Sequence, residues 1–208
     1  VPARYLVKYF NTDKVIYFSH GVDNKTFYPN ETPPISHNLL MVANNGLGGY
    51  GSHDRKGFEL GIKTAMSRNL PITIVGPKNN QNWFDVNPWI GGYPKLSILE
   101  NPSNDMLRQI YTSHTIFLHP SELEVGHPNL TLLEAAACGL PIVGTLEMET
   151  TFHGLWRAPR DLNEILQGLD TIIKEYHQYR TRAIKTSQEL SWLNRSKELI
   201  TVYERYFN

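Results

Sequence analysis

Residues 115–144 read TIFLHPSELEVGHPNLTLLEAAACGLPIVG, and this stretch decides the fold. Its first part, Thr115–Leu118, is a short apolar run of strand length, and Ile142–Gly144 is another. Between them, Leu130–Cys138 has the composition of a helix, and a Gly-Leu-Pro turn separates it from the second strand. A strand, a helix and a second strand in this order predict a βαβ unit with parallel strands.

The same alternation continues on both sides of this stretch. Short apolar runs predict further strands, and amphipathic spacing or a polar helix-start residue predicts further helices. The strands are expected at Val15–Phe18, Leu39–Ala43, Ile72–Val75 and Leu96–Leu99, and the helices at 56–69, 103–111, 161–173 and 192–206. Strands that alternate with helices predict an α/β fold, a Rossmann-like doubly wound parallel sheet, in a single domain.

Composition and charge exclude several classes of protein. The 208 residues carry 20 Lys and Arg against 20 Asp and Glu, and such a neutral chain is not typical of a dedicated nucleic-acid-binding protein. The sequence contains no run of about eighteen apolar residues, so no membrane segment is expected in this chain. The single cysteine, Cys138, is expected to pack in the core and indicates a reducing compartment, so we predict a cytoplasmic location. Peripheral attachment to a membrane through a further domain is the open alternative.

Two predicted loops lie where parallel sheets bind ligands, at the carboxyl ends of the strands. The first, 44–51, is glycine-rich and precedes Arg55 and Lys56, but its spacing matches neither a Walker A loop nor a dinucleotide-binding fingerprint. The second, 122–129, leads into the helix that carries Glu134. Helix N-termini favour phosphate, so Arg55 and Lys56 are expected to bind a diphosphate together with helix amides. The alternative for this pair is a solvated surface position.

The stretch that decides the fold also resembles a known family. Residues 117–121 and 127–145 are similar to the signature of the retaining family 4 glycosyltransferases, and the resemblance continues in order over about residues 15–206. Ser19–Asp23 resembles the start of the second domain of these enzymes, and Trp192 matches a tryptophan near their last helices. The resemblance implies a GT-B fold, in which two Rossmann-like domains face a cleft. Residues 1–208 would be the C-terminal domain, which binds the nucleotide sugar, with the N-terminal acceptor domain absent from this chain.

The glycine-rich loop resembles the phosphate loop of the family. Lys56 matches the phosphate-binding lysine and is expected to act in catalysis as well as in binding. Arg55 and Gly46 are expected to contact the same diphosphate. The arginine of the family pattern falls near Asn44, so its contact is either missing or made by Arg55.

The second loop leads into a helix that is expected to bind the rest of the nucleotide. Asn129, Leu130 and Thr131 open this helix, and their amides would face a pyrophosphate. The family assigns the ribose hydroxyls to the glutamate that matches Glu134, a role that suits a carboxylate with two acceptor oxygens.

One position departs from the family pattern. The glutamate that usually contacts the sugar falls at Gly126, and Glu124 lies two residues upstream. We predict that Glu124 takes this catalytic role, and the open alternative is that the contact is lost. The histidines, the cysteine and the acidic residues show no metal-ligand spacing, so no metal site and no cofactor are expected.

Together these features predict a hexosyltransferase-type glycosyltransferase. Its substrate would be a UDP- or GDP-linked sugar, transferred to an acceptor hydroxyl with retention at the anomeric carbon. Because the acceptor half is expected to be absent, we predict that this chain binds nucleotide but does not transfer sugar. The alternatives are a non-catalytic nucleotide-sugar-binding module and a nucleotide-sugar epimerase of the same fold.

Overall fold

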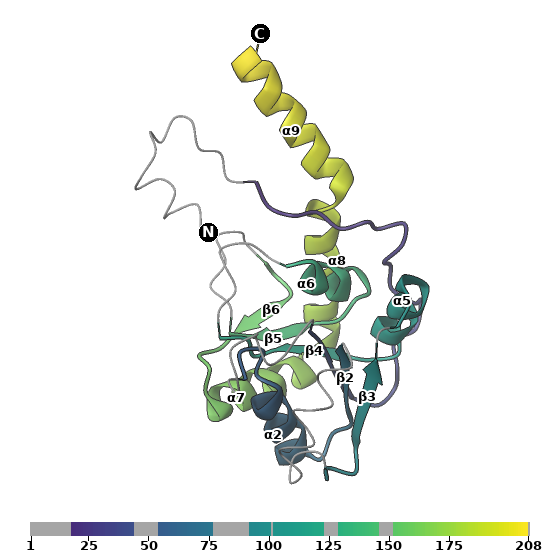
Figure 1. The fold of residues 1–208 in the computed structure, drawn as a ribbon, viewed down its shortest axis with the longest axis vertical. Coiled ribbons are helices and arrows are strands. Elements are labelled where there is room, and N and C mark those ends of the chain that lie inside the picture. The colour runs from purple at the N-terminus through teal and green to yellow at the C-terminus, as the bar shows by residue number, and fades with distance from the viewer. Residues whose placement is uncertain are drawn as a thin grey trace.

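A computed structural model describes residues 18–43, 54–76, 92–100, 102–122, 129–145 and 152–207 (Figure 1). These residues form a sheet of six parallel strands in the order β3-β2-β1-β4-β5-β6. The strands are β1 (Leu39–Val42), β2 (Ile72–Gly76), β3 (Leu96–Glu100), β4 (Ile116–His119), β5 (Ile142–Gly144) and β6 (Leu155–Arg157). The structure confirms the predicted Rossmann-like doubly wound sheet. In this strand order the chain leaves β3 at one edge and returns to β4 beside β1, so the order reverses between β1 and β4.

Helices cover both faces of the sheet (Figure 1). One face packs against α2 (Phe58–Arg68) and α7 (Leu162–Lys174), and the other against α5 (Asn104–Thr112) and α6 (Leu130–Ala137). Helix α8 (Tyr176–Glu189) contributes Tyr179 to the first core and Ala183 to the second. Successive residues of a strand point to opposite faces, so Leu39 and Met41 of β1 join the first core and Leu40 joins the second. Apolar side chains bury both faces of β1, as its continuous apolar sequence predicted.

The helix of the deciding stretch ends one turn before Pro141 because Gly139 adopts a left-handed conformation, with φ of 84°. The amide of Gly139 donates to the carbonyl of Ala136, and that of Leu140 to Ala135, which is a Schellman motif. This turn directs the chain back into β5. The predicted order of strand, helix and strand is therefore confirmed. Both ends of the first strand and the end of the helix differ from the predicted bounds by one residue, and the second strand has the predicted bounds.

Two of the described elements were missed by the sequence analysis. Strand β6 is a Leu-Trp-Arg tripeptide, too short to show a period. Helix α8 has a polar sequence, and its buried stripe includes Tyr179, Ala183 and Thr186 rather than a run of aliphatic residues. The expected strand Val15–Phe18 lies outside the described residues except for Phe18, which is not in a strand.

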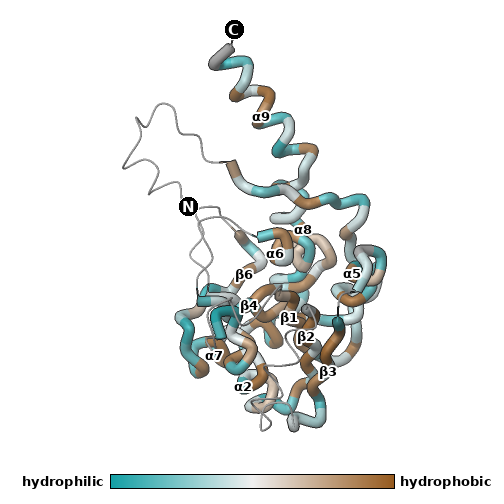
Figure 2. The backbone as a smooth tube through the Cα atoms, viewed as in Figure 1, coloured by the Kyte–Doolittle hydropathy of each residue, from teal (hydrophilic) through white to brown (hydrophobic). Residues whose placement is uncertain are grey.

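The segment around Val22, near the start of the described chain, pairs with residues 190–192, which follow α8. The amide of Val22 donates to the carbonyl of Leu190 at 3.0 Å, and the amide of Trp192 donates to the carbonyl of Val22 at 3.0 Å. A Cβ at Gly21 would lie 2.8 Å from the Trp192 ring, so only glycine allows this approach. From this contact α9 (Trp192–Phe207) projects away from the sheet (Figure 1). Hydrophobic positions recur along α9 although it leaves the body of the domain (Figure 2). Among the described helices, none is long and apolar enough to cross a membrane.

Candidate functional site

The carboxyl ends of β1 and β4 form the switch point of the sheet, where ligands of doubly wound folds bind. Residues 54–57 lead into α2 after β1, and residues 120–122 follow β4 directly. Thr145, which follows β5, donates its amide to the carbonyl of His119 at 3.2 Å and its hydroxyl to the carbonyl of Ser121 at 2.5 Å. The segments after β4 and β5 are therefore joined at this edge.

Asp54 caps the helix that follows β1. Its carboxylate accepts the amides of Phe58 at 2.9 Å and Glu59 at 2.8 Å. Burial raises the pKa of Asp54, while these backbone hydrogen bonds oppose that rise. The first amides of α2 are thus hydrogen-bonded to a side chain of the same segment. The positive charge available to a ligand at this junction therefore comes from the side chains of Arg55 and Lys56, which are both half-buried.

The segments after β1 and β4 touch through backbone atoms. The amide of Glu122 donates to the carbonyl of Arg55 at 2.8 Å, and the hydroxyl of Ser121 donates to the same carbonyl at 3.3 Å. Gly57 has a φ of 75°, and a Cβ there would lie 2.2 Å from the carbonyl oxygen of Pro120. Glycine at this position lets the two segments approach, which fixes Arg55 and Lys56 beside the end of β4.

Arg160, which the sequence analysis missed, joins these same segments from beyond β6. Its guanidinium donates to the carbonyl of Pro120 at 3.2 Å and to the carbonyl of Asp54 at 2.5 Å. It also forms an ion pair with Glu122 at 3.8 Å. The only sequence signal was a cation placed just before Asp161, the capping residue of the next helix.

The N-terminus of α6 lies at the second predicted junction. The side-chain oxygen of Asn129 accepts the amide of Leu132 at 3.1 Å and the hydroxyl of Thr131 at 2.8 Å. The amides of Leu130 and Thr131 have no acceptor among the described residues. Two amides at the positive end of a helix dipole can bind an anion.

Glu134 lies one turn further along α6, where it is half-buried. Its Oε2 accepts the hydroxyl of Tyr111, on α5, at 3.0 Å. Burial raises the pKa of Glu134 to about 6, and the hydrogen bond from Tyr111 opposes this rise. Tyr111 ends the helix expected at 103–111, but nothing in the sequence links it to Glu134, 23 residues away.

The structure thus places six of the predicted site residues at two adjacent strand-to-helix junctions. Arg55 and Lys56 lie at the first; Asn129, Leu130, Thr131 and Glu134 lie at the second and along its helix. Gly46 and Glu124, together with Asn44 and Gly126, lie outside the described residues. Within the described ranges, no group of His, Cys, Asp and Glu side chains could hold a metal ion.

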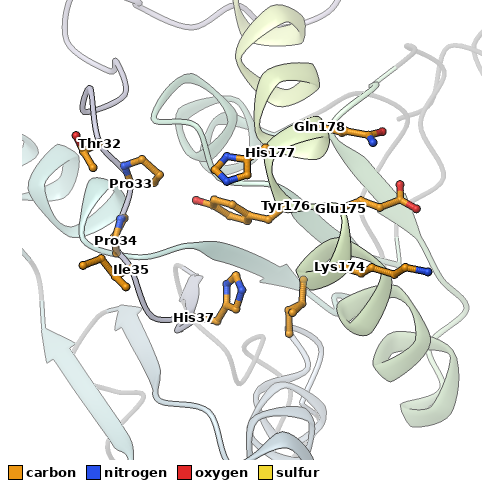
Figure 3. A pocket seen from close by; sticks show the side chains of 11 residues that line it. Thr32, Pro33, Pro34, Ile35, His37, Lys174, Glu175, Tyr176, His177 and Gln178 are labelled. Atoms are coloured by element: carbon orange, nitrogen blue, oxygen red, sulfur yellow. The ribbon is translucent and has the colours of Figure 1, made fainter.

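A separate hollow of about 600 Å³ lies between the segment before β1 and the junction of α7 with α8 (Figure 3). His37 and Tyr176 line it, with ring centroids 5.4 Å apart, and burial lowers the pKa of His37. Because residues 32–37 lead into the amino end of β1, this hollow lies at the opposite edge of the sheet from the switch point. It is therefore separate from the candidate site.

Comparison with known families identifies one match. Residues 48–175 match the model of the family described as glycosyl transferases group 1. This range contains both junctions and the whole stretch that decides the fold. No curated protein matches the sequence significantly.

Solved structures share the fold over most of the chain. A sucrose-phosphate synthase from Thermosynechococcus elongatus is 16% identical, with a TM-score of 0.75, over 98% of this chain and 56% of that one. A glycosyltransferase from Rickettsia africae is also 16% identical, with a TM-score of 0.75, over 97% of this chain and 60% of that one. The C-terminal domain of a group 1 family glycosyl transferase from Francisella tularensis is 17% identical, with a TM-score of 0.59, over 81% of this chain and 95% of that domain. This chain therefore spans somewhat more than half the length of the first two.

Proposed function

This chain belongs to the group 1 glycosyl transferases, and we propose that it is the C-terminal domain of a GT-B enzyme, where it binds a UDP- or GDP-linked sugar. The full-length enzyme would transfer that sugar to an acceptor hydroxyl with retention at the anomeric carbon. The family membership supports the transferase activity, and the geometry of the switch point supports the assignment of the nucleotide.

One observation carries the nucleotide assignment. The amides of Leu130 and Thr131 have no acceptor within the described part of the chain, and they open a helix at the point where doubly wound sheets bind ligands. Further along the same helix, Oε1 of Glu134 has no partner among the described residues and is not buried. A diphosphate would bind the amides at the helix N-terminus, and a ribose would bind the carboxylate of Glu134. The two sites follow one another along the helix as the diphosphate and the ribose do in a nucleotide.

The proposed chemistry follows from the charges at the first junction. When the sugar leaves, negative charge develops on the nucleoside diphosphate. Lys56, with Arg55 beside it and the α6 amides opposite, would stabilise this charge, and groups that are already fixed in place do so without reorganisation. Glu124 is the candidate for the contact with the sugar, and it stays a prediction because it lies outside the described residues.

The exposed face of α9 supports the proposal of a second domain. Leu193, Leu199, Ile200 and Tyr203 are between 41% and 66% exposed, and their spacing places them on one side of the helix. A monomeric domain rarely leaves such a stripe uncovered. We expect the N-terminal acceptor domain of the same protein to cover it, and therefore expect no sugar transfer by residues 1–208 alone.

Isothermal titration calorimetry of the 208-residue chain with UDP and with GDP tests the nucleotide assignment. We expect one of the two to bind, with Glu134→Ala weakening binding by about tenfold or more because a charged hydrogen-bond partner is lost. Lys56→Ala should weaken it similarly, whereas Lys63→Ala, within the helix that follows and in an ion pair with Glu59, should not. Failure of both nucleotides to bind at millimolar concentration would overturn the proposal.

A non-catalytic binding module is the second candidate, and Gly126 in place of a glutamate favours it. A full-length protein that binds the nucleotide sugar and neither transfers nor hydrolyses it would support this candidate. Transfer that Glu124→Gln abolishes would exclude it.

A further inference from the structure

We infer that Tyr111 is the positioning residue of the nucleotide site, holding the carboxylate of Glu134 so that Oε1 faces the ribose. This inference rests on the proposed function of Glu134. It concerns a side chain that is completely buried and would therefore act through Glu134 and not through its own contact with the ligand.

The hydroxyl of Tyr111 has a single proton to donate, and the distances show where it goes. Oε2 of Glu134 lies 3.0 Å away, whereas the carbonyl oxygen of Thr131 lies 3.4 Å away. The shorter contact is to the charged acceptor, which forms the stronger hydrogen bond. One oxygen of Glu134 is thereby fixed, and the other is left for a ligand.

Tyr111 is itself immobilised by aromatic neighbours from two other segments. Its ring meets Phe27 edge-on, with centroids 6.0 Å apart, and Phe117 of β4 at 6.1 Å. A glutamate on a helix surface has several rotamers, and ordering them on binding costs affinity. A fixed phenol removes that cost before the nucleotide arrives.

The same contact controls the charge of Glu134. Of the described titratable groups, Tyr111 and Cys138 face this carboxylate. Burial raises the pKa of Tyr111 well above its usual value and that of Cys138 to about 12, so both stay neutral near neutral pH. Glu134, with a pKa of about 6, is the group that titrates there, and the Tyr111 hydrogen bond keeps its pKa from rising further. Without the phenol, a larger fraction of Glu134 would be protonated at neutral pH.

The test compares Tyr111→Phe with the wild-type chain in calorimetric titrations of UDP and GDP from about pH 6 to about pH 8. We expect affinity to fall by about three- to tenfold at the alkaline end, where the loss of orientation acts alone. The deficit should widen toward the acid end because Glu134 of the variant protonates at higher pH. Comparison at equal pH cancels the titration of the nucleotide phosphate.

Two further measurements separate positioning from packing. Phe152→Leu disturbs the same buried core and keeps the phenol and both of its aromatic neighbours, so it should lower the thermal midpoint and leave both affinity and its pH dependence unchanged. An NMR titration of the Glu134 carboxyl carbon, with no nucleotide present, should show a higher pKa in Tyr111→Phe than in the wild type.

The outcomes distinguish this inference from the proposed function. If the wild type binds nucleotide and folded Tyr111→Phe binds it equally well across the pH range, the positioning role is overturned and the proposed function stands. If the carboxyl titration is the same in both proteins, the role is overturned whatever the nucleotide result. A wild type that binds neither UDP nor GDP overturns the proposed function and, with it, the role of Tyr111.

Discussion

The side-chain nitrogen of Asn129 donates to Nε2 of His119 at 2.8 Å and so joins the N-terminus of α6 to the end of β4. The orientation of the amide is fixed because its oxygen already accepts the amide of Leu132 and the hydroxyl of Thr131. Nε2 of His119 must therefore be an acceptor, which makes the ring neutral with its proton on Nδ1. One asparagine thus caps the helix and anchors it to the sheet beside the switch point.

Substitutions at Asn129 should separate these two roles. Asn129→Ala removes both and should lower the free energy of unfolding by about 1–2 kcal/mol. Asn129→Ser retains a capping oxygen but is too short to reach His119, so about half of that loss is expected. Urea denaturation of the three proteins measures the difference. Equal loss in both variants would show that the contact with His119, and not the cap, carries the stability.

The carboxylate of Glu134 should cost stability at neutral pH. Burial raises the pKa of Glu134 from 4.5 to about 6 in the folded protein, so the fold is more stable with this carboxyl protonated than with it ionised. That extra stability is fully present below the unfolded pKa and is lost as pH rises through about 6. Glu134→Gln imitates the protonated form and should unfold at higher urea concentration than the wild type at about pH 8, by about 1–2 kcal/mol, with little difference at about pH 4.5. Glu31→Gln, the same change at an exposed position, is the control. If Glu134→Gln proves less stable than the wild type at alkaline pH, the predicted sign is wrong.

Gly57 should tolerate no side chain. Gly57→Ala places a Cβ 2.2 Å from the backbone oxygen of Pro120 and requires a left-handed conformation, so it should cost more than about 2 kcal/mol. Gly61→Ala, within α2, also meets a close neighbour, Sδ of Met41 at 2.3 Å, but a methionine side chain can move and alanine favours the helix. In thermal unfolding, Gly57→Ala should therefore have a clearly lower midpoint temperature than Gly61→Ala. The reverse order would show that the segments after β1 and β4 separate easily.

The sequence predicted the features that depend on local patterns. Apolar runs located β1 to β5, and the Asn before Leu130 together with the glycine after Cys138 located the ends of α6, because caps are local. The family resemblance linked Gly21 and Trp192 to the ends of the domain, and the structure brings them into contact.

The contacts that shape the site could not be predicted in this way. Tyr111 reaches Glu134 from a different helix, and Arg160 reaches the backbone of Asp54 across 106 residues. Neither contact produces a periodic pattern or a fixed spacing in the sequence, because each depends on the order of strands in the folded sheet. The cap that Asp54 forms on α2 was missed for a different reason, since the adjacent Arg55 and Lys56 suggested that the amides of this helix bind a ligand.

Arg160 should be needed for its shape as well as its charge. It donates to two carbonyls of different segments and pairs with Glu122, and a planar guanidinium can do this where an ammonium cannot. Arg160→Lys keeps the charge but should lower the free energy of unfolding by about 1 kcal/mol and weaken nucleotide binding, since the backbone that carries Lys56 loses a support. Arg157→Lys, at the exposed end of β6, is the matched control and should leave both unchanged. If Arg160→Lys has wild-type stability and binds nucleotide with wild-type affinity, the backbone contacts of Arg160 do not hold the site. Arg160 would then contribute only its exposed ion pair with Glu122, and such a pair is weak in water.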